Sequence, residues 1–277
     1  MPPPPADHPT GPMTDRWEKA PMLNLSSLRV ACSNCNLRES CLPTGLSLKE
    51  VERVEDLVST RKRVKRGEAL FRVGDSFEAV YAVRLGFLKS IVLSSDGREQ
   101  VTNFFMAGDM VGVDGIASGV HSCDVIALED TEVCMIPWET LEDTATSMHA
   151  MGSHFMKLLS REIVRQHGVM LLLGSMHAEE RLAAFLLSLS QRYEQRGYSR
   201  AEFVLRMTRA EIGSYLGLKL ETVSRVLSRF SHDGLIDVNQ KHVRILNAEG
   251  LRAIVSGVPP ENADDTPPAR KIPVKKA

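Results

Sequence analysis

The spacing of apolar positions changes along this chain, and each change predicts a different kind of element. Between residues 46 and 59 the apolar residues recur at helical spacing, and Ser47 with Glu50 three positions later forms a capping box, which predicts a short helix. Between residues 61 and 138 the pattern becomes a series of short apolar or alternating runs separated by Gly-containing turns. This second pattern predicts a small antiparallel β-barrel or jelly roll.

A long helical pattern follows, from about residue 141 to residue 173. Apolar residues at three- and four-residue spacing form a candidate seam, interrupted by Glu162, Arg165 and Gly168; its members are Met151, Phe155, Leu158, Val169 and Leu172. About 30 residues is more helix than a small barrel can cover, which favours pairing with a second copy in a coiled coil. Charged seam positions and an interior Gly make this pairing weak. The alternative is a core helix that packs only on its own barrel.

The last third of the chain contains a helix-turn-helix pattern. After the amphipathic segment AEERLAAFLLSLSQRY, Thr208 and Glu211 form a second capping box, Gly217 supplies a turn, and a second helix runs from about residue 220 to residue 232. The segments LIDV and HVRI then predict a hairpin of the winged-helix type. The core face of the second helix is predicted to carry Val223, Val226, Leu227 and Phe230.

The opposite face of that second helix carries a polar row suited to the edges of bases. Arginine pairs with guanine, glutamate accepts from cytosine, and serine can donate or accept. The row consists of Glu221, Ser224, Arg225 and Ser228. We expect Thr222 and Arg209 in the same DNA interface, and Lys241 and Arg244 of the wing at phosphates.

Composition and charge help to divide the chain into domains and tails, and they agree with the predicted DNA-binding domain. The chain has 277 residues with a net charge of −1, so a basic surface can only be local; residues 192–244 hold ten Lys and Arg against six acids. The amino terminus lacks the features of a signal peptide, and no apolar stretch approaches the roughly 20 residues that span a membrane, so we expect a cytoplasmic protein. The predicted units are a disordered tail 1–22, a sensory domain 23–140, a dimerisation helix 141–173, a winged helix-turn-helix domain 174–247 and a disordered tail 257–277.

The cysteines suggest bound metal. Cys32, Cys35 and Cys41 form a C-x2-C-x5-C cluster, and Cys134 or Cys123, both in the predicted barrel, could supply a fourth thiolate. Free thiolates in a reducing compartment bind soft metals, and an iron–sulfur cluster normally takes four of them. Zinc also accepts four thiolates, so spacing alone leaves both centres open.

Together these segments resemble the Crp/Fnr superfamily of bacterial transcription regulators, and specifically its oxygen-sensing Fnr group. The resemblance covers about residues 30–246 and rests on the cysteine cluster, the VC-x-IP segment around Cys134, AEERLAAF at 178–185, and MTRAEIGSYLGL followed by ETVSR at 207–225. It implies an α+β fold with a cyclic-nucleotide-binding-type β-barrel (jelly roll), a long dimerisation helix and a C-terminal winged helix-turn-helix.

The resemblance also implies a function. It implies a [4Fe-4S] cluster on Cys32, Cys35, Cys41 and Cys134 that supports a DNA-binding homodimer without oxygen, with loss of the dimer when oxygen converts the cluster. Glu221, Ser224 and Arg225 take the places of the family's base-reading residues, which implies two-fold sites with TTGAT and ATCAA half-sites on double-stranded DNA. RNA polymerase is the expected protein partner, and no membrane is involved.

The sequence does not support two other functions, a cyclic AMP sensor and an enzyme. Residues 108–128 contain no Arg to neutralise a nucleotide phosphate, so cyclic AMP is not expected as the effector, and no P-loop, G-x-S-x-G or other catalytic motif predicts an enzyme. A regulator of the same superfamily that senses another signal through zinc or heme is the alternative function.

Overall fold

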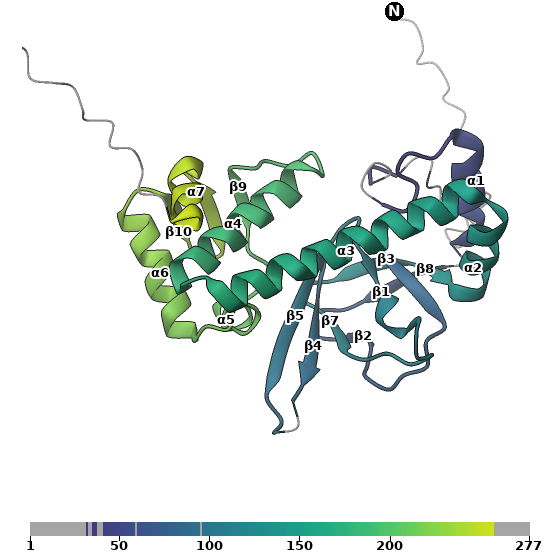
Figure 1. The fold of residues 1–277 in the computed structure, drawn as a ribbon, viewed down its shortest axis with the longest axis horizontal. Coiled ribbons are helices and arrows are strands. Elements are labelled where there is room, and N and C mark those ends of the chain that lie inside the picture. Colours follow the sequence, from purple (N-terminus) through teal and green to yellow (C-terminus); the bar gives the residue numbers. More distant parts are fainter. Residues whose placement is uncertain (1–31, 33–34, 38–40, 59, 95, 258–277) are drawn as a thin grey trace, which may run out of the picture.

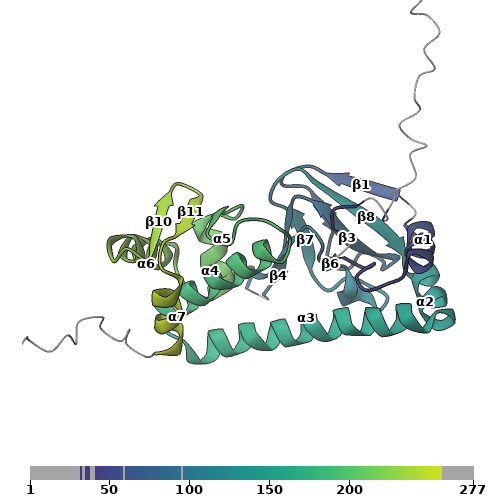
Figure 2. The ribbon, with the colours of Figure 1, turned by 90° about the horizontal axis from the view of Figure 1, so that it is seen from above.

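The computed structural model describes residues 32, 35–37, 41–58, 60–94 and 96–257. They form a β-barrel, a long helix that crosses the front of the molecule, and a helical winged domain at the far end of that helix (Figures 1 and 2). The predicted tail 1–22 and all but Gly257 of the predicted tail 257–277 lie outside the described residues. In the described part of the chain no helix is long and apolar enough to cross a membrane.

The barrel consists of two antiparallel four-stranded sheets, preceded by the predicted helix. The sheets have the strand orders β1-β8-β3-β6 and β2-β7-β4-β5. Their elements are α1 (Leu48–Leu57), β1 (Thr60–Val64), β2 (Ala69–Phe71), β3 (Ala79–Leu85), β4 (Phe87–Leu93), β5 (Glu99–Met106), β6 (Met110–Val111), the 3-10 turn Val113–Gly115, β7 (Asp124–Ala127) and β8 (Thr131–Pro137). The capping box of Ser47 and Glu50 is confirmed at the start of α1.

The predicted long helix is two helices, α2 (Trp138–Ser147) and α3 (His149–Ser175). The chain is extended at Met148, with φ −119° and ψ 95°, and its side chain is buried. Gly152 allows the two helices to approach closely, because a Cβ there would lie 2.6 Å from the carbonyl oxygen of Ala145. The prediction of one continuous helix was therefore wrong at its first turns.

The predicted seam of α3 was also wrong, because three of its five apolar members are buried against their own chain. Met151, Phe155 and Leu172 are buried, and Glu162 accepts a hydrogen bond from Asn103 of β5 at 3.1 Å. A second apolar stripe remains uncovered in this chain. It has exposed residues every seven positions, each followed three positions later by a half-buried residue; the stripe comprises Met156, Leu159, Ile163, Gln166, Met170 and Leu173.

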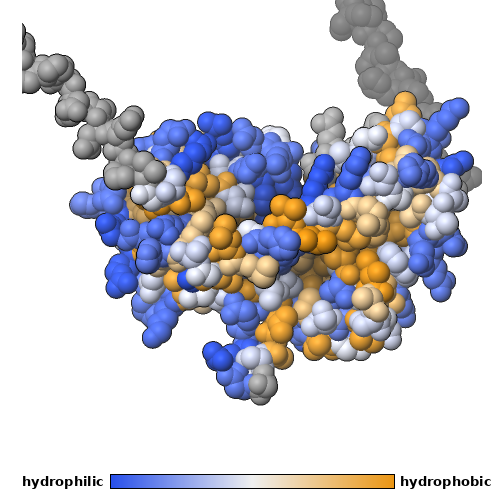
Figure 3. Space-filling model, in the orientation of Figure 1, coloured by the Kyte–Doolittle hydropathy of each residue, from blue (hydrophilic) through white to orange (hydrophobic). Residues whose placement is uncertain are grey.

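This second stripe has the spacing of a coiled-coil seam, and we call it the α3 seam. Met156, Ile163 and Met170 are 64%, 56% and 62% exposed. Hydrophobic side chains gather in Figure 3 along the band where α3 crosses the front of the molecule. A helix with two apolar stripes can pack on its own barrel and on a second copy at once, which reconciles the two alternatives left open by the sequence.

The C-terminal domain has the predicted winged helix-turn-helix fold with two additions. Its elements are α4 (Ala178–Glu194), β9 (Glu202–Val204), α5 (Arg209–Leu216), α6 (Leu220–His232), β10 (Ile236–Asn239), β11 (His242–Ile245) and α7 (Ala248–Ser256). The capping box of Thr208 and Glu211 opens α5, and Gly217 is left-handed with φ 63° at the turn. The sequence did not predict β9, which completes the sheet order β10-β11-β9, or α7, which packs on α4.

One hydrophobic core runs across the boundary between barrel and C-terminal domain. Phe104 of β5 lies 6.2 Å from Phe185 of α4 and 5.1 Å from Tyr215 of α5, measured between ring centroids. Phe104 is almost fully buried. The two parts of the chain therefore pack as one body in this conformation.

Candidate metal centre and nucleic-acid interface

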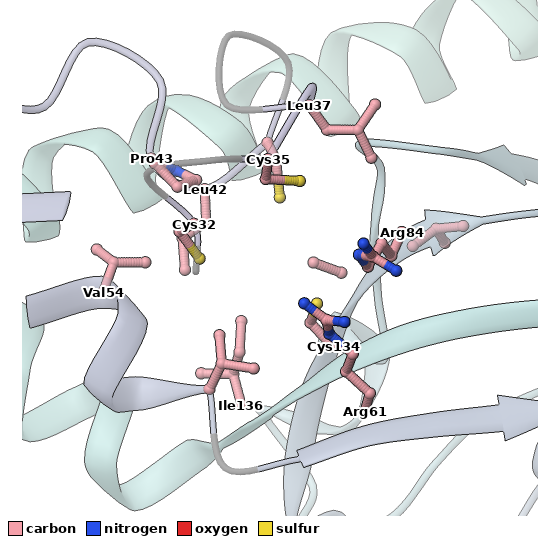
Figure 4. A pocket seen from close by; sticks show the side chains of 14 residues that line it. Cys32, Cys35, Leu37, Leu42, Pro43, Val54, Arg61, Arg84, Cys134 and Ile136 are labelled. Atoms are coloured by element: carbon pink, nitrogen blue, oxygen red, sulfur yellow. The ribbon is translucent and has the colours of Figure 1, made fainter. Parts of the chain in front are cut away.

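Four of the five cysteines line one pocket between the N-terminal loop and the barrel. Cys32, Cys35 and Cys41 come from the loop, whereas Cys134 lies on β8, where it is paired with Arg61 of β1 on one side and Ala82 of β3 on the other. Figure 4 shows Cys32 and Cys35 on one side of this pocket and Cys134 on the other. All four are free thiols. We call this site the cysteine pocket.

Short turns and a few apolar residues hold the loop in place. The amide of Cys35 donates to the carbonyl of Cys32 at 3.2 Å, and the amide of Thr44 donates to the carbonyl of Cys41 at 3.0 Å. Leu42 is only 1% exposed and packs in a core that includes Phe155 of α3. The loop is thus anchored at Cys41 and Leu42, where it meets the first half of the long helix.

The thiols of the cysteine pocket are strongly disfavoured as bare thiolates. The pKa of Cys32 and that of Cys41 are raised to about 12, chiefly by burial and in part by the neighbouring Cys134. Burial also raises the pKa of Cys134, although Arg61 opposes this. Several thiolates in one buried site need a cationic centre to compensate them. The donor set therefore fits a thiolate-bound metal or cluster.

Two arginines add positive charge that the sequence did not draw attention to. Arg61 and Arg84 line the pocket beside Cys134 (Figure 4). Arg84 donates to Glu132 at 2.6 Å, so one carboxylate offsets part of this charge. A four-thiolate iron–sulfur centre carries net negative charge, and such cations stabilise it. The basic run in TRKRV (residues 60–64) was a signal for Arg61, but it gave none for Arg84.

A zinc ion and an iron–sulfur cluster require different spacings of their cysteine ligands. Within the described residues, no three His, Cys, Asp or Glu side chains lie close enough together to hold a single metal ion. Zinc–sulfur bonds of about 2.3 Å in a tetrahedron bring the sulfurs to within roughly 3.8 Å of one another. A cluster binds its four cysteines through different iron atoms and so accepts a wider arrangement. The described side chains therefore show no preformed zinc site, although four cysteines line the one pocket.

Cys123 lies apart from this pocket. The sequence placed it on a barrel strand, but it occupies the bend directly before β7, where its thiol contacts the Asp114 carboxylate at 3.7 Å. Burial, followed by Asp114, raises its pKa to about 12. Cys123 lines a different cavity, so the alternative in which it replaces Cys134 has no geometric support.

The cavity that Cys123 lines lies between barrel strands and α3, and its lining residues include no cation. Asp114 and Glu162 contribute carboxylates to it, and no Lys or Arg is among its lining residues. Phosphate groups would meet negative charge there without a counter-charge. That cyclic AMP is not the effector stays a prediction from the sequence.

The polar face of α6 is open to solvent. Glu221, Arg225 and Ser228 are exposed and Ser224 is half-buried, while the four predicted core residues of this helix are all buried. Arg209 of α5 donates to the hydroxyl of Ser224 at 3.2 Å, which places it beside this face. The helix-turn-helix thus presents the predicted row as one surface, with Thr222 half-buried next to it.

The edges of this surface are basic. Lys219 is the N-cap residue of α6 and makes no side-chain capping bond, which leaves its ammonium group at the start of the helix. Lys241 is exposed between β10 and β11, whereas Arg244 forms an ion pair with Glu202 at 3.5 Å. Exposed Lys and Arg around a polar helix face are typical of phosphate contacts on either side of a major groove.

Comparison with known proteins finds two family models that match this chain, one in each half. Residues 61–147 match the model of the cyclic nucleotide-binding domain, and residues 180–254 match that of the Crp-like helix-turn-helix domain. The chain is 47% identical to the transcriptional regulatory protein Btr of Bordetella pertussis over 224 residues, covering 81% of this chain and 93% of that protein. It is 42% identical to the fumarate and nitrate reduction regulatory protein of Escherichia coli K12 over 222 residues, covering 80% of this chain and 89% of that protein.

Solved structures agree with this placement. FixK2 from Bradyrhizobium japonicum matches with a TM-score of 0.67 and 31% identity, over 72% of this chain and 98% of that chain. The matched relatives span both the barrel and the helix-turn-helix and are transcription regulators, not enzymes. The chain belongs to the Crp/Fnr family of DNA-binding transcription regulators, in its Fnr-like group.

Proposed function

We propose that this regulator responds to oxygen through a [4Fe-4S] cluster held by Cys32, Cys35, Cys41 and Cys134. The observation that carries the proposal is that four cysteines from two distant segments line one pocket with Arg61 and Arg84 beside it. The identity to fumarate and nitrate reduction regulators supports it. When bound, such a cluster supplies an oxygen-labile cross-link between the loop and β8.

The chain's own packing offers a route from that cross-link to the dimer. Cys32, Cys41 and Cys134 pack in the same core as Met151 and Phe155 of α3. His154 of α3, which is 8% exposed, also hydrogen-bonds to the backbone of Cys41. Holding the loop therefore holds the first half of α3, whose outer stripe is the α3 seam. Release of the loop would loosen the helix on which dimer formation depends.

The dimer is proposed to bind two-fold DNA sites with TTGAT and ATCAA half-sites, one α6 helix in each. Dimeric reading of half-sites about 34 Å apart requires both helices to be held at once. RNA polymerase remains the proposed protein partner. The cytoplasm is the proposed location, because a reducing compartment keeps the thiols free for metal.

Anaerobic purification tests this function. We expect a brown protein with about four irons and four sulfides per chain, and loss of both the visible absorption and the dimer on exposure to air. The same sample is assayed for zinc and heme. Stoichiometric zinc without sulfide, or a heme spectrum, would replace oxygen sensing through a cluster with the corresponding alternative.

Base reading by α6 gives a separate expectation. Arg225→Ala should weaken binding to the matched operator by about 1 to 3 kcal/mol and relax the preference at one base pair. Lys241→Ala is the comparison, because a phosphate contact should weaken binding to all sequences alike and reduce the salt dependence. Titration of matched and single-substituted operators at several salt concentrations separates the two. Equal losses on all operators for Arg225→Ala would remove it from base reading.

A further inference from the structure

Beside the shared hydrophobic core, two largely buried ion-pair groups connect the barrel to the helix-turn-helix domain. The Lys89 ammonium group of β4 donates to the Glu211 carboxylate of α5 at 2.8 Å, with side chains only 15% and 19% exposed. Asp109, in the turn between β5 and β6, forms ion pairs with Arg192 and with Arg196, the latter at 2.7 Å. We call these contacts the domain interface.

A third contact docks α5 at a second point. The amide of Val101 on β5 donates to the hydroxyl of Ser214 at 2.9 Å. Ser214 lies three residues after Glu211, so both side chains are on one face of α5. The helix is therefore held against the β4–β5 hairpin along one turn of its length, and it cannot rotate without breaking both contacts.

The covalent connection between the two domains is short and would not fix their orientation. Only Met176 and His177 join α3 to α4, and both have extended backbones. Arg181 braces this hinge, donating to the carbonyls of Leu173, Met176 and Leu216. The angle of α5 and α6 relative to the barrel is therefore set by the shared hydrophobic core and by the domain interface.

The interface leaves the polar face of α6 open. Lys89 and Val101 contact α5, and Glu221, Arg225 and Ser228 remain exposed in the same conformation. A contact that only inhibited DNA binding would be expected to cover this face. An orienting contact would hold α5 and leave α6 free, as seen here.

We propose that Lys89 and Asp109 are positioning residues for DNA recognition, which set the angle of α6 relative to the dimer axis and so the half-site spacing that the dimer accepts. Lys89 acts through Glu211, and Asp109 acts through Arg192 and Arg196. A change in this angle displaces both recognition helices of a two-fold dimer, so the interface controls spacing and not the identity of the bases.

The pKa values of Glu211 and Asp109 support the two groups of ion pairs. Burial alone would raise the pKa of Glu211, but its bonds with Lys89 and Thr208 outweigh this and hold the pKa below its ordinary value. Burial likewise opposes ionisation of Asp109, and Arg192 with Arg196 reverses the effect and lowers its pKa. Both carboxylates are therefore charged at neutral pH, when the interface is intact.

Two variants remove the same contact from opposite sides. Lys89→Met keeps the length of the side chain and removes its charge. Glu211→Gln removes the charge and keeps an acceptor for the capping box of α5, because Gln serves at this position of the motif. Lys65→Met, at an exposed position of the same barrel, is the matched control.

The experiment measures the spacing preference of full-length dimers. An operator is selected from random duplex DNA with the wild-type protein, and its half-sites are then moved apart or together by one and two base pairs. We expect Lys89→Met and Glu211→Gln to lose about tenfold in affinity for the selected spacing and at least half of the discrimination against the others. The double variant should lose no more than either single one, because the two changes remove one interaction.

Several outcomes would overturn the proposal. Unchanged discrimination in both variants would reduce the interface to a stabilising contact, and additive losses would show that Lys89 and Glu211 act separately. Tighter binding at every spacing would make the contact inhibitory. Sedimentation and thermal unfolding of each variant identify losses that come from dissociation or misfolding. The operator is selected with the dimer, in whichever redox state the dimer forms. The test therefore remains valid even if the protein binds no iron–sulfur cluster.

Discussion

We expect Cys134→Ala to abolish cluster assembly in protein prepared without oxygen, whereas Cys123→Ala should assemble a full cluster. Cys134 shares the cysteine pocket with the three loop cysteines, and Cys123 lines a different cavity beside Asp114. Loss of one thiolate from a four-thiolate site leaves an iron atom without its protein ligand. Iron, sulfide and visible absorption measured on both variants give the result directly.

The loop cysteines should behave like Cys134. Cys32→Ala, Cys35→Ala and Cys41→Ala are each expected to lose the cluster, and with it the anaerobic dimer. Cys123→Ala is matched to these variants in chemistry and in burial, since all of the cysteines are half-buried in this chain. A cluster that survives Cys134→Ala and disappears in Cys123→Ala would reverse the ligand assignment.

Ile163→Glu should convert the anaerobic dimer to a monomer. Ile163 lies at the middle of the α3 seam and is 56% exposed in the single chain. Burying it against a partner contributes about 1 to 2 kcal/mol in each copy, and a carboxylate there faces its own symmetry mate. Loss of both copies should weaken dimerisation by roughly a hundredfold or more. Sedimentation equilibrium without oxygen measures the change.

Neighbouring positions distinguish this seam from other arrangements. Val164→Glu is the matched control, because Val164 is also exposed, at 65%, but lies outside the seven-residue repeat. Glu162→Leu, which the sequence pattern favoured as a stabiliser, should not strengthen the dimer, since Glu162 bonds to Asn103 of its own barrel. Gln166→Leu replaces the polar member of the α3 seam and should give a dimer that persists in air. A dimer lost in Val164→Glu and kept in Ile163→Glu would place the seam on the adjacent stripe.

The elements that the sequence predicted well depend on local interactions. Both capping boxes, at Ser47 and at Thr208, are formed, because a capping box involves residues only three positions apart. The core face of α6 followed from helical spacing within a single helix. The break at Met148 was not visible, because it depends on the close approach of Gly152 to Ala145.

The features that were missed depend on contacts between distant segments. Periodicity located one apolar stripe on α3 but could not say whether it faces the barrel or a partner, and Met151 shows that it faces the barrel. The convergence of Cys134 with the N-terminal loop was expected from the family resemblance. The position of Arg84 beside the cysteine pocket requires the pairing of β3 with β8, which no local pattern reveals.

The packing of Phe104 against Phe185 and Tyr215 has a consequence for the modularity of this protein. A fragment starting at Ala178 would carry a complete winged helix-turn-helix in sequence, yet it would expose aromatic rings that the barrel normally covers. Such a fragment would tend to self-associate. Exchange of the C-terminal domain with that of another family member would likewise require the matching β4–β5 surface. The unit that can be exchanged between proteins is therefore the C-terminal domain together with the β4–β5 surface on which it packs.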